Sequence, residues 1–459
     1  MVSTSRPRPP SVERLLAAVA PLLGDSAPDR DAVVAAARAV IADERAGLVE
    51  NARSQPRQLA DLAEAVVARL HEAATGSSAA PVSVINATGV IVHTNLGRAS
   101  WPREAIEAAR AAAAEPLLLE LDRQTGRRGT RYRAAEELLV ELTGAEDALV
   151  TNNNAAAVAL AVALAGRGRG VAVSRGELVE IGGEVRIPDI VRRAGARLVE
   201  VGTTNRTRAA DFGGPLESGQ ASLVLRVHRS NFRQEGFTED PDPVEVARIA
   251  HEHGAVVVDD LGSGALLDTS RFGLAHEPLP RERLAAGADV VTFSGDKLVG
   301  GPQAGFIVGR SDLVARIRRD PLARAMRPDK VTLAAVAATL VVYRGGRATS
   351  AIPVWRMIAA TPSTLRERAA AIARDVPGAR VAVIESTVGG GSLPGETLPS
   401  FGVALDGHAE RVAAALRRGT PCVVGRIVEG FVVLDVRTIE PDRDGDVVAA
   451  VRAALATVA

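Results

Sequence analysis

The chain opens with apolar residues at helical spacing. Between Val12 and Ala74 three stripes repeat every three or four residues, as amphipathic helices require, and breaks at Pro28 and Pro56 separate them. The stripes comprise Leu15, Leu16, Val19, Leu22 and Leu23; then Ala36, Val40 and Ile41; then Leu59, Leu62, Val66, Val67 and Leu70. We therefore expect a small helical N-terminal domain over 1–80, followed by a short linker rich in Ser, Ala and Gly.

Short continuous apolar runs alternate with helical stretches from about Val82 to Tyr343. Such runs, bounded by Gly, Asp or Ser, are typical of a parallel sheet buried on both faces. The expected strands are Ala148–Thr151, Gly170–Ser174, Arg197–Val201, Leu223–Val227, Ala255–Asp259, Asp289–Phe293 and Ala304–Val308. This pattern predicts a large α/β domain over 81–345, with its functional residues at the carboxyl ends of the strands.

The last part of the chain has a different pattern. One helix (Thr364–Arg374) precedes several strands, and a final helix ends the chain. The expected strands are Val381–Glu385, Phe401–Leu405, Cys422–Ile427 and Phe431–Asp435. We expect a smaller α+β domain over 346–459.

The amino-acid composition limits the classes of function that this chain can have. The formal net charge is zero, which gives no overall basic footprint for DNA or for a membrane surface. The single Cys422 excludes an internal disulfide and a metal cluster built on cysteines. No signal peptide and no apolar run of membrane-spanning length is recognisable, so the sequence predicts a soluble, cytoplasmic protein.

Lysine is very rare in this chain. Of 55 basic residues only Lys297 and Lys330 are lysines, as expected where a coding bias replaces Lys by Arg wherever either serves. Unlike arginine, a lysine amine can lose its proton and act as a nucleophile or a base. Lys297 follows a buried strand and precedes a Gly-rich turn, which is where a Schiff base to pyridoxal phosphate (PLP) can form. Lys330 is better explained as a surface residue.

Other groups that a PLP site needs occur in a sensible order. Asn152, Asn153 and Asn154 follow a strand and open an apolar helix, whose free N–H groups suit a phosphate, although a helix cap without a ligand explains them equally well. Ser294 can donate to the same phosphate. A carboxylate for the pyridine nitrogen comes from the end of the next strand, where Asp259 is our assignment and Asp260 competes with it.

Arginines supply candidate anion-binding groups. Arg98 ends a polar stretch punctuated by glycines, while Arg324 and Arg327 have the i,i+3 spacing that places two guanidinium groups on one helix face. A solvated basic face is the simpler explanation for that pair in a chain so rich in arginine. His93 and His228 lie near these features and are interpreted as structural histidines.

Together these motifs resemble bacterial selenocysteine synthase, the L-seryl-tRNA(Sec) selenium transferase family. The resemblance extends in order along nearly the whole chain and rests on five segments. They are Asn86–Arg98 (NATGVIVHTNLGR), Asp122–Tyr132 (DRQTGRRGTRY), Asn152–Val158 (NNNAAAV), Ser294–Gly305 (SGDKLVGGPQAG) and Gly389–Pro394 (GGGSLP).

The resemblance implies an α/β PLP-dependent transferase fold of the aspartate aminotransferase type. It also implies that serine esterified to tRNA(Sec) is converted to selenocysteine with selenophosphate, through an aldimine with PLP and an aminoacrylyl-tRNA. Carried over, Lys297 resembles the aldimine lysine and Asp296 the acid beside it. Arg98, Arg324 and Arg327 match the arginines that hold selenophosphate. The family's N-terminal domain binds tRNA, and its oligomer is a homodecamer.

Two observations keep alternatives open. Residues 1–80 hold 9 Arg, no Lys and 10 Asp or Glu, so RNA binding there would need a local patch such as Arg53 and Arg57 with the tail residues Arg6 and Arg8. A PLP-dependent lyase acting on a free small amino acid or an amino sugar phosphate would share the catalytic core, but it would not need the N-terminal helices. A non-catalytic tRNA-binding protein on the same fold is disfavoured by the intact Lys297 motif.

Overall fold

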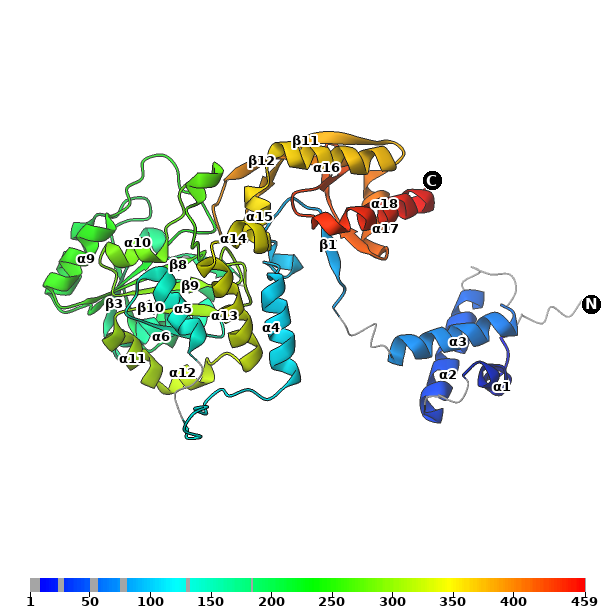
Figure 1. The fold of residues 1–459 in the computed structure, drawn as a ribbon, viewed down its shortest axis with the longest axis horizontal. Helices are drawn as coiled ribbons and strands as arrows, with labels where there is room; N and C mark the ends of the chain where they lie inside the picture. Colours follow the sequence, from blue (N-terminus) through cyan, green and yellow to red (C-terminus); the bar gives the residue numbers. More distant parts are fainter. Residues whose placement is uncertain are drawn as a thin grey trace, which may run out of the picture. The chain divides into compact units, whose positions relative to one another are not determined.

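The computed structural model describes residues 9–23, 29–49, 57–74, 81–128, 133–182 and 185–458. The chain divides into two compact units, Met1–Ser83 and Val84–Ala459, coloured from blue to red along the sequence in Figure 1. Within the described residues no helix is both long enough and apolar enough to cross a membrane. Each unit has its own hydrophobic core.

The first unit contains three helices, α1 (Val12–Leu23), α2 (Arg30–Val49) and α3 (Leu59–Ala74). The apolar stripes meet in one core, in which Leu15, Val19 and Leu62 are fully buried, so the prediction of a helical N-terminal domain is confirmed. The buried carboxylate of Glu44 accepts hydrogen bonds from the Arg57 backbone N–H (2.8 Å) and from Nε (2.7 Å).

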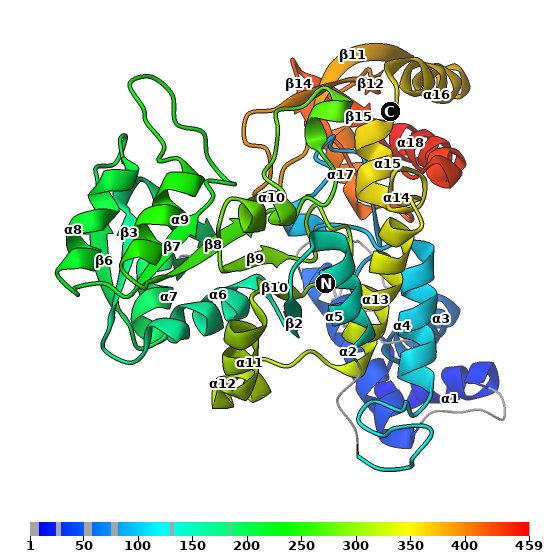
Figure 2. The same cartoon turned by 60° about the vertical axis from the view of Figure 1, so that its left-hand side comes forward.

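A seven-stranded sheet forms the centre of the second unit. Its order is β2-β10-β9-β8-β7-β3-β6, and Figure 2 shows these strands side by side. Their bounds are β2 Asp147–Thr151, β3 Gly170–Ser174, β6 Arg197–Val201, β7 Leu223–Val227, β8 Val256–Gly262, β9 Val290–Ser294 and β10 Gly305–Gly309. All seven expected strands are present.

One expectation about this sheet is wrong. Strand β10 is antiparallel to both of its neighbours, β9 and β2, so the sheet is mixed rather than parallel. The reason is the connection 295–304 between β9 and β10, which is too short for the crossover that a parallel pair requires. The chain therefore reverses direction in this loop, and the loop carries Lys297.

Helices cover both faces of the large sheet. On one face α6 (Asn154–Val162), α7 (Ile187–Arg193) and α11 (Ser311–Arg319) pack against strand residues that include Val258. On the other face α9 (Pro243–Glu252) packs against residues that include Val257. Since neighbouring residues of a strand point to opposite faces, β8 sends Asp259 and Asp260 to different sides of the sheet.

The remaining helices surround this layer and the C-terminal part. Their bounds are α4 Arg103–Ala114, α5 Ala134–Thr143, α8 Gly213–Glu217, α10 Pro280–Ala285, α12 Pro321–Ala325, α13 Lys330–Arg344, α14 Ala348–Ala351, α15 Pro353–Ala359, α16 Pro362–Asp375, α17 Ala409–Arg418 and α18 Asp444–Val458. Strands β4 (Glu180–Gly182) and β5 (Val185–Arg186) pair with each other in a small antiparallel sheet.

The C-terminal part contains an antiparallel sheet in the order β11-β12-β15-β14. Its strands are β11 Ala379–Thr387, β12 Thr397–Leu405, β14 Arg426–Val428 and β15 Phe431–Asp435. The expected strand Cys422–Ile427 is divided, because β13 (Cys422–Val424) instead pairs in parallel with β1 (Val84–Asn86). The α+β character is confirmed, while the exact boundary at 345/346 stays a prediction.

Candidate active site

Lys297 lies in the tight loop between β9 and β10. The loop closes on itself, because the Gly301 N–H donates to the Gly295 carbonyl (2.9 Å) and the Gly300 N–H donates to the carbonyl of Lys297 (3.0 Å). Gly300 has a φ of +70°, in the region that favours glycine. From outside the loop, the Tyr343 hydroxyl donates to the carbonyl of Leu298 or Val299, at 3.0 and 2.9 Å.

The amine of Lys297 is buried among groups from distant parts of the chain. The residue is 8% exposed, and its nearest hydrogen-bond acceptor is the carbonyl oxygen of Gly391, 3.5 Å away. Burial lowers the pKa of Lys297, and the positive charge of Arg98 lowers it further. A lysine in this setting loses its proton more readily, as a nucleophile or a base requires.

Asp296 connects Lys297 with Arg98. The Asp296 carboxylate accepts a hydrogen bond from Ser294 Oγ (2.7 Å) and lies 3.3 Å from Nη1 of Arg98. Arg98 has a positive φ of +65°, which is uncommon for a residue with a side chain and is typical of strained functional sites. The structure thus brings together the predicted residues Lys297, Asp296 and Arg98. The hydroxyl of Ser294 donates to Asp296, whereas the sequence analysis assigned it to the phosphate.

The asparagine run has three separate roles. Asn153 caps α6, since its side-chain oxygen accepts from the Ala156 N–H at 2.9 Å. Asn154 reaches across to β8 and donates to Oδ1 of Asp260 at 2.8 Å. Asn152 is exposed and is held by its backbone N–H, which donates to the Met326 carbonyl at 2.9 Å. The run is therefore both a helix cap and a link to the buried acid.

The two neighbouring aspartates have different surroundings. Oδ1 of Asp260 accepts from Asn154 and from Thr292 Oγ1 (2.9 Å), and its charge acts on Lys297. Burial raises the pKa of Asp260, while these hydrogen bonds and the Lys297 charge oppose that rise. Asp259 lies on the other face of the sheet, 3.6 Å from Nε of Arg283. The geometry therefore favours Asp260, the alternative to our assignment, over Asp259 as the acid on the Lys297 side.

Arg324 and Arg327 are less closely tied to this group. Arg324 is exposed on α12, and Arg327 follows the helix, with its Nη1 3.7 Å from Glu120 Oε1. Among the described residues no hydrogen bond or ion pair joins either arginine to Lys297 or to Arg98. Their assignment to the selenium donor stays a prediction. Lys330 donates to the Glu115 carbonyl at 2.6 Å, consistent with a structural role.

The residues present fit a PLP group. Several buried polar atoms around Lys297 have no hydrogen-bond partner within the described part of the chain, including Oδ1 of Asn154 and Oγ of Ser263 and of Ser392. Glycines keep the space open: a Cβ on Gly391 would lie 3.0 Å from Lys297 Nζ, and one on Gly262 would lie 3.9 Å from it. Polar atoms without partners beside a buried lysine are what a phosphorylated aromatic cofactor would satisfy.

Sequence reasoning gave no role to several residues of this site. The carbonyl of Gly391 comes from a glycine run in which Gly389, Gly390 and Gly391 have φ values of +72°, +60° and +76°. That run was visible in the sequence as a motif, but its proximity to Lys297 was not. Thr292 is an inward-facing strand residue with no sequence signal of its own. Of the arginines suggested for RNA binding, Arg57 pairs with Glu44, while Arg53, Arg6 and Arg8 lie outside the described residues, as do positions 129–132 of the Asp122–Tyr132 motif.

The fold is similar to that of a solved D-glucosaminate-6-phosphate ammonia-lyase. The TM-score is 0.60 and the identity 24%, and the match covers 84% of this chain and 98% of that chain. This likeness confirms the predicted class, an α/β transferase-type fold of the aspartate aminotransferase kind with a smaller C-terminal α+β part.

Sequence comparison then identifies the family. The sequence model of L-seryl-tRNA selenium transferase matches residues 84–440. A protein of Rhizobium meliloti (strain 1021) described as L-seryl-tRNA(Sec) selenium transferase is 45% identical over 453 residues, 95% of each chain. One of Methylocella silvestris with the same description is 46% identical over 446 residues, covering 94% of this chain and 93% of the other. The chain belongs to the L-seryl-tRNA selenium transferase family, which confirms the resemblance.

Proposed function

We propose that this protein converts L-seryl-tRNA(Sec) to L-selenocysteinyl-tRNA(Sec) with selenophosphate as the selenium donor and PLP as cofactor. The observation that carries the proposal is Lys297, a buried amine with a lowered pKa on which the charges of an acid on β8 and of an arginine both act. Family membership supports the substrate, since the relatives carry that activity in their description.

Each residue has a task in this proposal. Lys297 binds the cofactor and takes the proton from the α-carbon of the seryl group. Asp260, oriented by Asn154 and Thr292, holds the proton of the pyridine nitrogen. The N–H groups at the N-terminus of α6 would hold the phosphate. When bound, PLP supplies the electron sink that stabilises negative charge on the α-carbon.

Arg98 is the arginine best placed for the anionic donor. Its guanidinium lies beside Asp296, the neighbour of Lys297, and its charge acts on the Lys297 amine. A fixed positive charge there would hold an anionic selenium donor near the reacting carbon. Arg324 and Arg327 complete the donor site in our proposal, although their support is the family motif rather than a contact.

Partners and assembly belong to the same proposal. The helical unit Met1–Ser83 has its own core, as a separate tRNA-binding domain needs. The homodecamer rests on the resemblance alone, whereas the cytoplasmic location rests on the sequence pattern, in which no signal peptide is recognisable. Mass measurement of the purified protein in solution tests the decamer.

The rival is a lyase that acts on a free small amino acid or an amino sugar phosphate. The fold likeness to an ammonia-lyase fits both readings. The N-terminal helices favour the tRNA enzyme, since a small substrate gives them no task.

A spectral titration of the purified protein separates the two. We expect the absorbance of the bound cofactor to change with seryl-tRNA(Sec) and not with free serine. A change with free serine alone would favour the lyase, and an absence of any cofactor band would contradict the PLP assignment. In the same assay Asp260→Asn should shift the cofactor band and abolish turnover, whereas Asp259→Asn should keep the band; the reverse result would restore Asp259.

A further inference from the structure

A histidine and a glutamate form a pair beside the lysine site that the proposed mechanism does not yet use. Nε2 of His228 lies 3.2 Å from Oε1 of Glu277. Glu277 is 2% exposed, and although the two atoms are close, neither of them makes a hydrogen bond within the described part of the chain. A buried polar atom without a hydrogen-bond partner costs free energy, so the position of this pair calls for an explanation.

The backbone on both sides fixes the pair. His228 follows β7, and its N–H donates to the Asp260 carbonyl at 2.8 Å. The Glu277 N–H donates to Thr269 Oγ1 at 2.9 Å, and the nearby Ala275 N–H donates to Glu396 Oε2 at 2.8 Å. Both side chains are therefore presented from anchored segments rather than from free loops.

The pair lies close to Lys297. The charge of Glu277 acts on the Lys297 amine, although more weakly than those of Arg98, Asp260 and Asp296. Two residues after His228, Ser230 Oγ is 3.9 Å from the position of a Cβ on Gly391, and that position is itself 3.0 Å from Lys297 Nζ. A group bound at Lys297 would thus have the pair within its surroundings.

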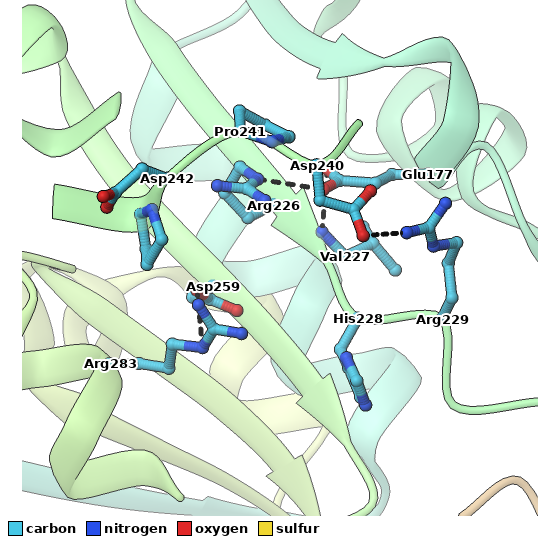
Figure 3. Close-up of a pocket in the computed structure, with 11 residues that line it drawn as sticks. Glu177, Arg226, Val227, His228, Arg229, Asp240, Pro241, Asp242, Asp259 and Arg283 are labelled. Atoms are coloured by element: carbon cyan, nitrogen blue, oxygen red, sulfur yellow. Dashed lines mark hydrogen bonds and ion pairs between the residues drawn. The ribbon is translucent and has the colours of Figure 1, made fainter. Parts of the chain in front are cut away.

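A polar cavity of about 420 Å³ is lined by His228 together with Asp259 and Arg283 (Figure 3). Its inner wall is charged: Arg226 pairs with Glu177 at 2.9 Å, and Arg283 lies 3.6 Å from Asp259. Its outer wall includes the exposed Asp240 and Asp242, so the cavity is continuous with solvent. Through this cavity His228 has access to solvent, from which it can regain a proton.

We propose that His228 and Glu277 act together as the proton donor to the β-hydroxyl of the seryl group. This inference rests on the proposed function and assigns the acid that the elimination step requires. A hydroxide ion is a poor leaving group, so an acid within reach of the oxygen accelerates its departure.

The step balances as a loss of water. Lys297 takes the proton from the α-carbon, and the electron pair left there forms the double bond to the β-carbon. The bond between the β-carbon and oxygen breaks with both electrons going to oxygen, which takes a proton from the His228–Glu277 pair and leaves as water. The pair regains a proton from solvent through the cavity, and Lys297 releases its own to solvent.

Changing the leaving group tests the acid role. Chloride leaves without a proton, so tRNA(Sec) carrying β-chloroalanine should not need the pair. We expect His228→Gln and Glu277→Gln each to lower kcat on seryl-tRNA(Sec) by about 10²–10⁴-fold, the usual contribution of an acid catalyst, and to change kcat on the chloroalanyl ester by less than about fivefold. Exchange of the seryl α-proton with ²H₂O should continue in both variants.

Controls separate this role from damage to the structure. His251→Gln removes a similar pair, His251 Nε2 to Asp289 Oδ2 at 3.0 Å on α9, and should leave both activities unchanged. All variants should keep the cofactor absorbance and the unfolding temperature of the unmodified protein. Equal losses on both esters, or loss of α-proton exchange, would overturn the acid role, as would full activity of both variants. A wild-type protein inactive on both esters would instead refute the proposed function.

Discussion

Gly391 provides a sharp test of the site, because its carbonyl and its missing side chain both face Lys297. At a φ of +76°, any residue with a Cβ costs about 1–2 kcal/mol in backbone strain. In Gly391→Ala the new Cβ would also lie 3.0 Å from Nζ, where an ordinary contact is about 3.5–4.0 Å. The amine must therefore move by a few tenths of an ångström.

A displacement of this size has a predictable effect on turnover. Misplacing a reacting group by about 1 Å costs roughly 10²-fold in rate, so for this smaller shift we expect Gly391→Ala to lower kcat by about 10-fold and to slow capture of PLP. Steady-state kinetics with seryl-tRNA(Sec) and the rate of cofactor absorbance after PLP is added to stripped protein measure both effects.

The matched control is Gly430→Ala. Gly430 has a φ of +82° in the turn between β14 and β15, but no atom lies within 4 Å of its added Cβ. The two variants should lose similar stability in thermal unfolding, because both introduce the same backbone strain, and only Gly391→Ala should lose activity. If both variants keep kcat within about twofold of each other, the glycine does not set the position of the lysine.

Two further predictions concern the charged groups of the site. Burial lowers the pKa of Lys297, so in cofactor-free protein its protonation opposes folding at pH values below its folded pKa, and this cost disappears as pH rises through the unfolded pKa of about 10.4. Lys297→Met should therefore stabilise the cofactor-free protein at pH 7 and lose this advantage near pH 11 in denaturant titrations; a constant difference would contradict it. Changing Arg324 and Arg327 together to Ala should raise KM for selenophosphate by about 10-fold or more, since hydrogen bonds between charged groups contribute about 1.5–3 kcal/mol each, without weakening tRNA binding in filter assays. Loss of tRNA affinity would give these arginines a different role.

The strands and the lysine were predictable because each has a local signal. Continuous apolar runs identify buried strands wherever they pair, and the rarity of lysine singles out Lys297 on composition and flanking residues alone. The direction of β10 has no such signal in its own residues. It is set by the connection 295–304, whose length rules out a crossover between parallel strands, so strand-like patterns alone gave the wrong direction.

The identity of the buried acid shows where local patterns stop being informative. Asp259 and Asp260 are adjacent, have the same side chain and are both 4% exposed, so neither residue type nor burial distinguishes them. What distinguishes them is the face of the sheet to which each points, and this depends on the packing of α6 and α9 against β8. Asn154 then marks the relevant face, because its side chain spans from α6 to Asp260 and not to Asp259.

Tertiary packing also gives His228 a role other than the structural one that its sequence context suggested. A lone histidine after a strand is more simply explained as structural, and at the end of β7 it lines the cavity that also holds Asp259. Glu277, which comes from a segment 49 positions further along the chain, places a carboxylate 3.2 Å from that histidine, so the two form a histidine–carboxylate pair. In our proposal the site therefore uses two separate acids: Asp260 on β8 for the cofactor, and the His228–Glu277 pair for the leaving hydroxyl.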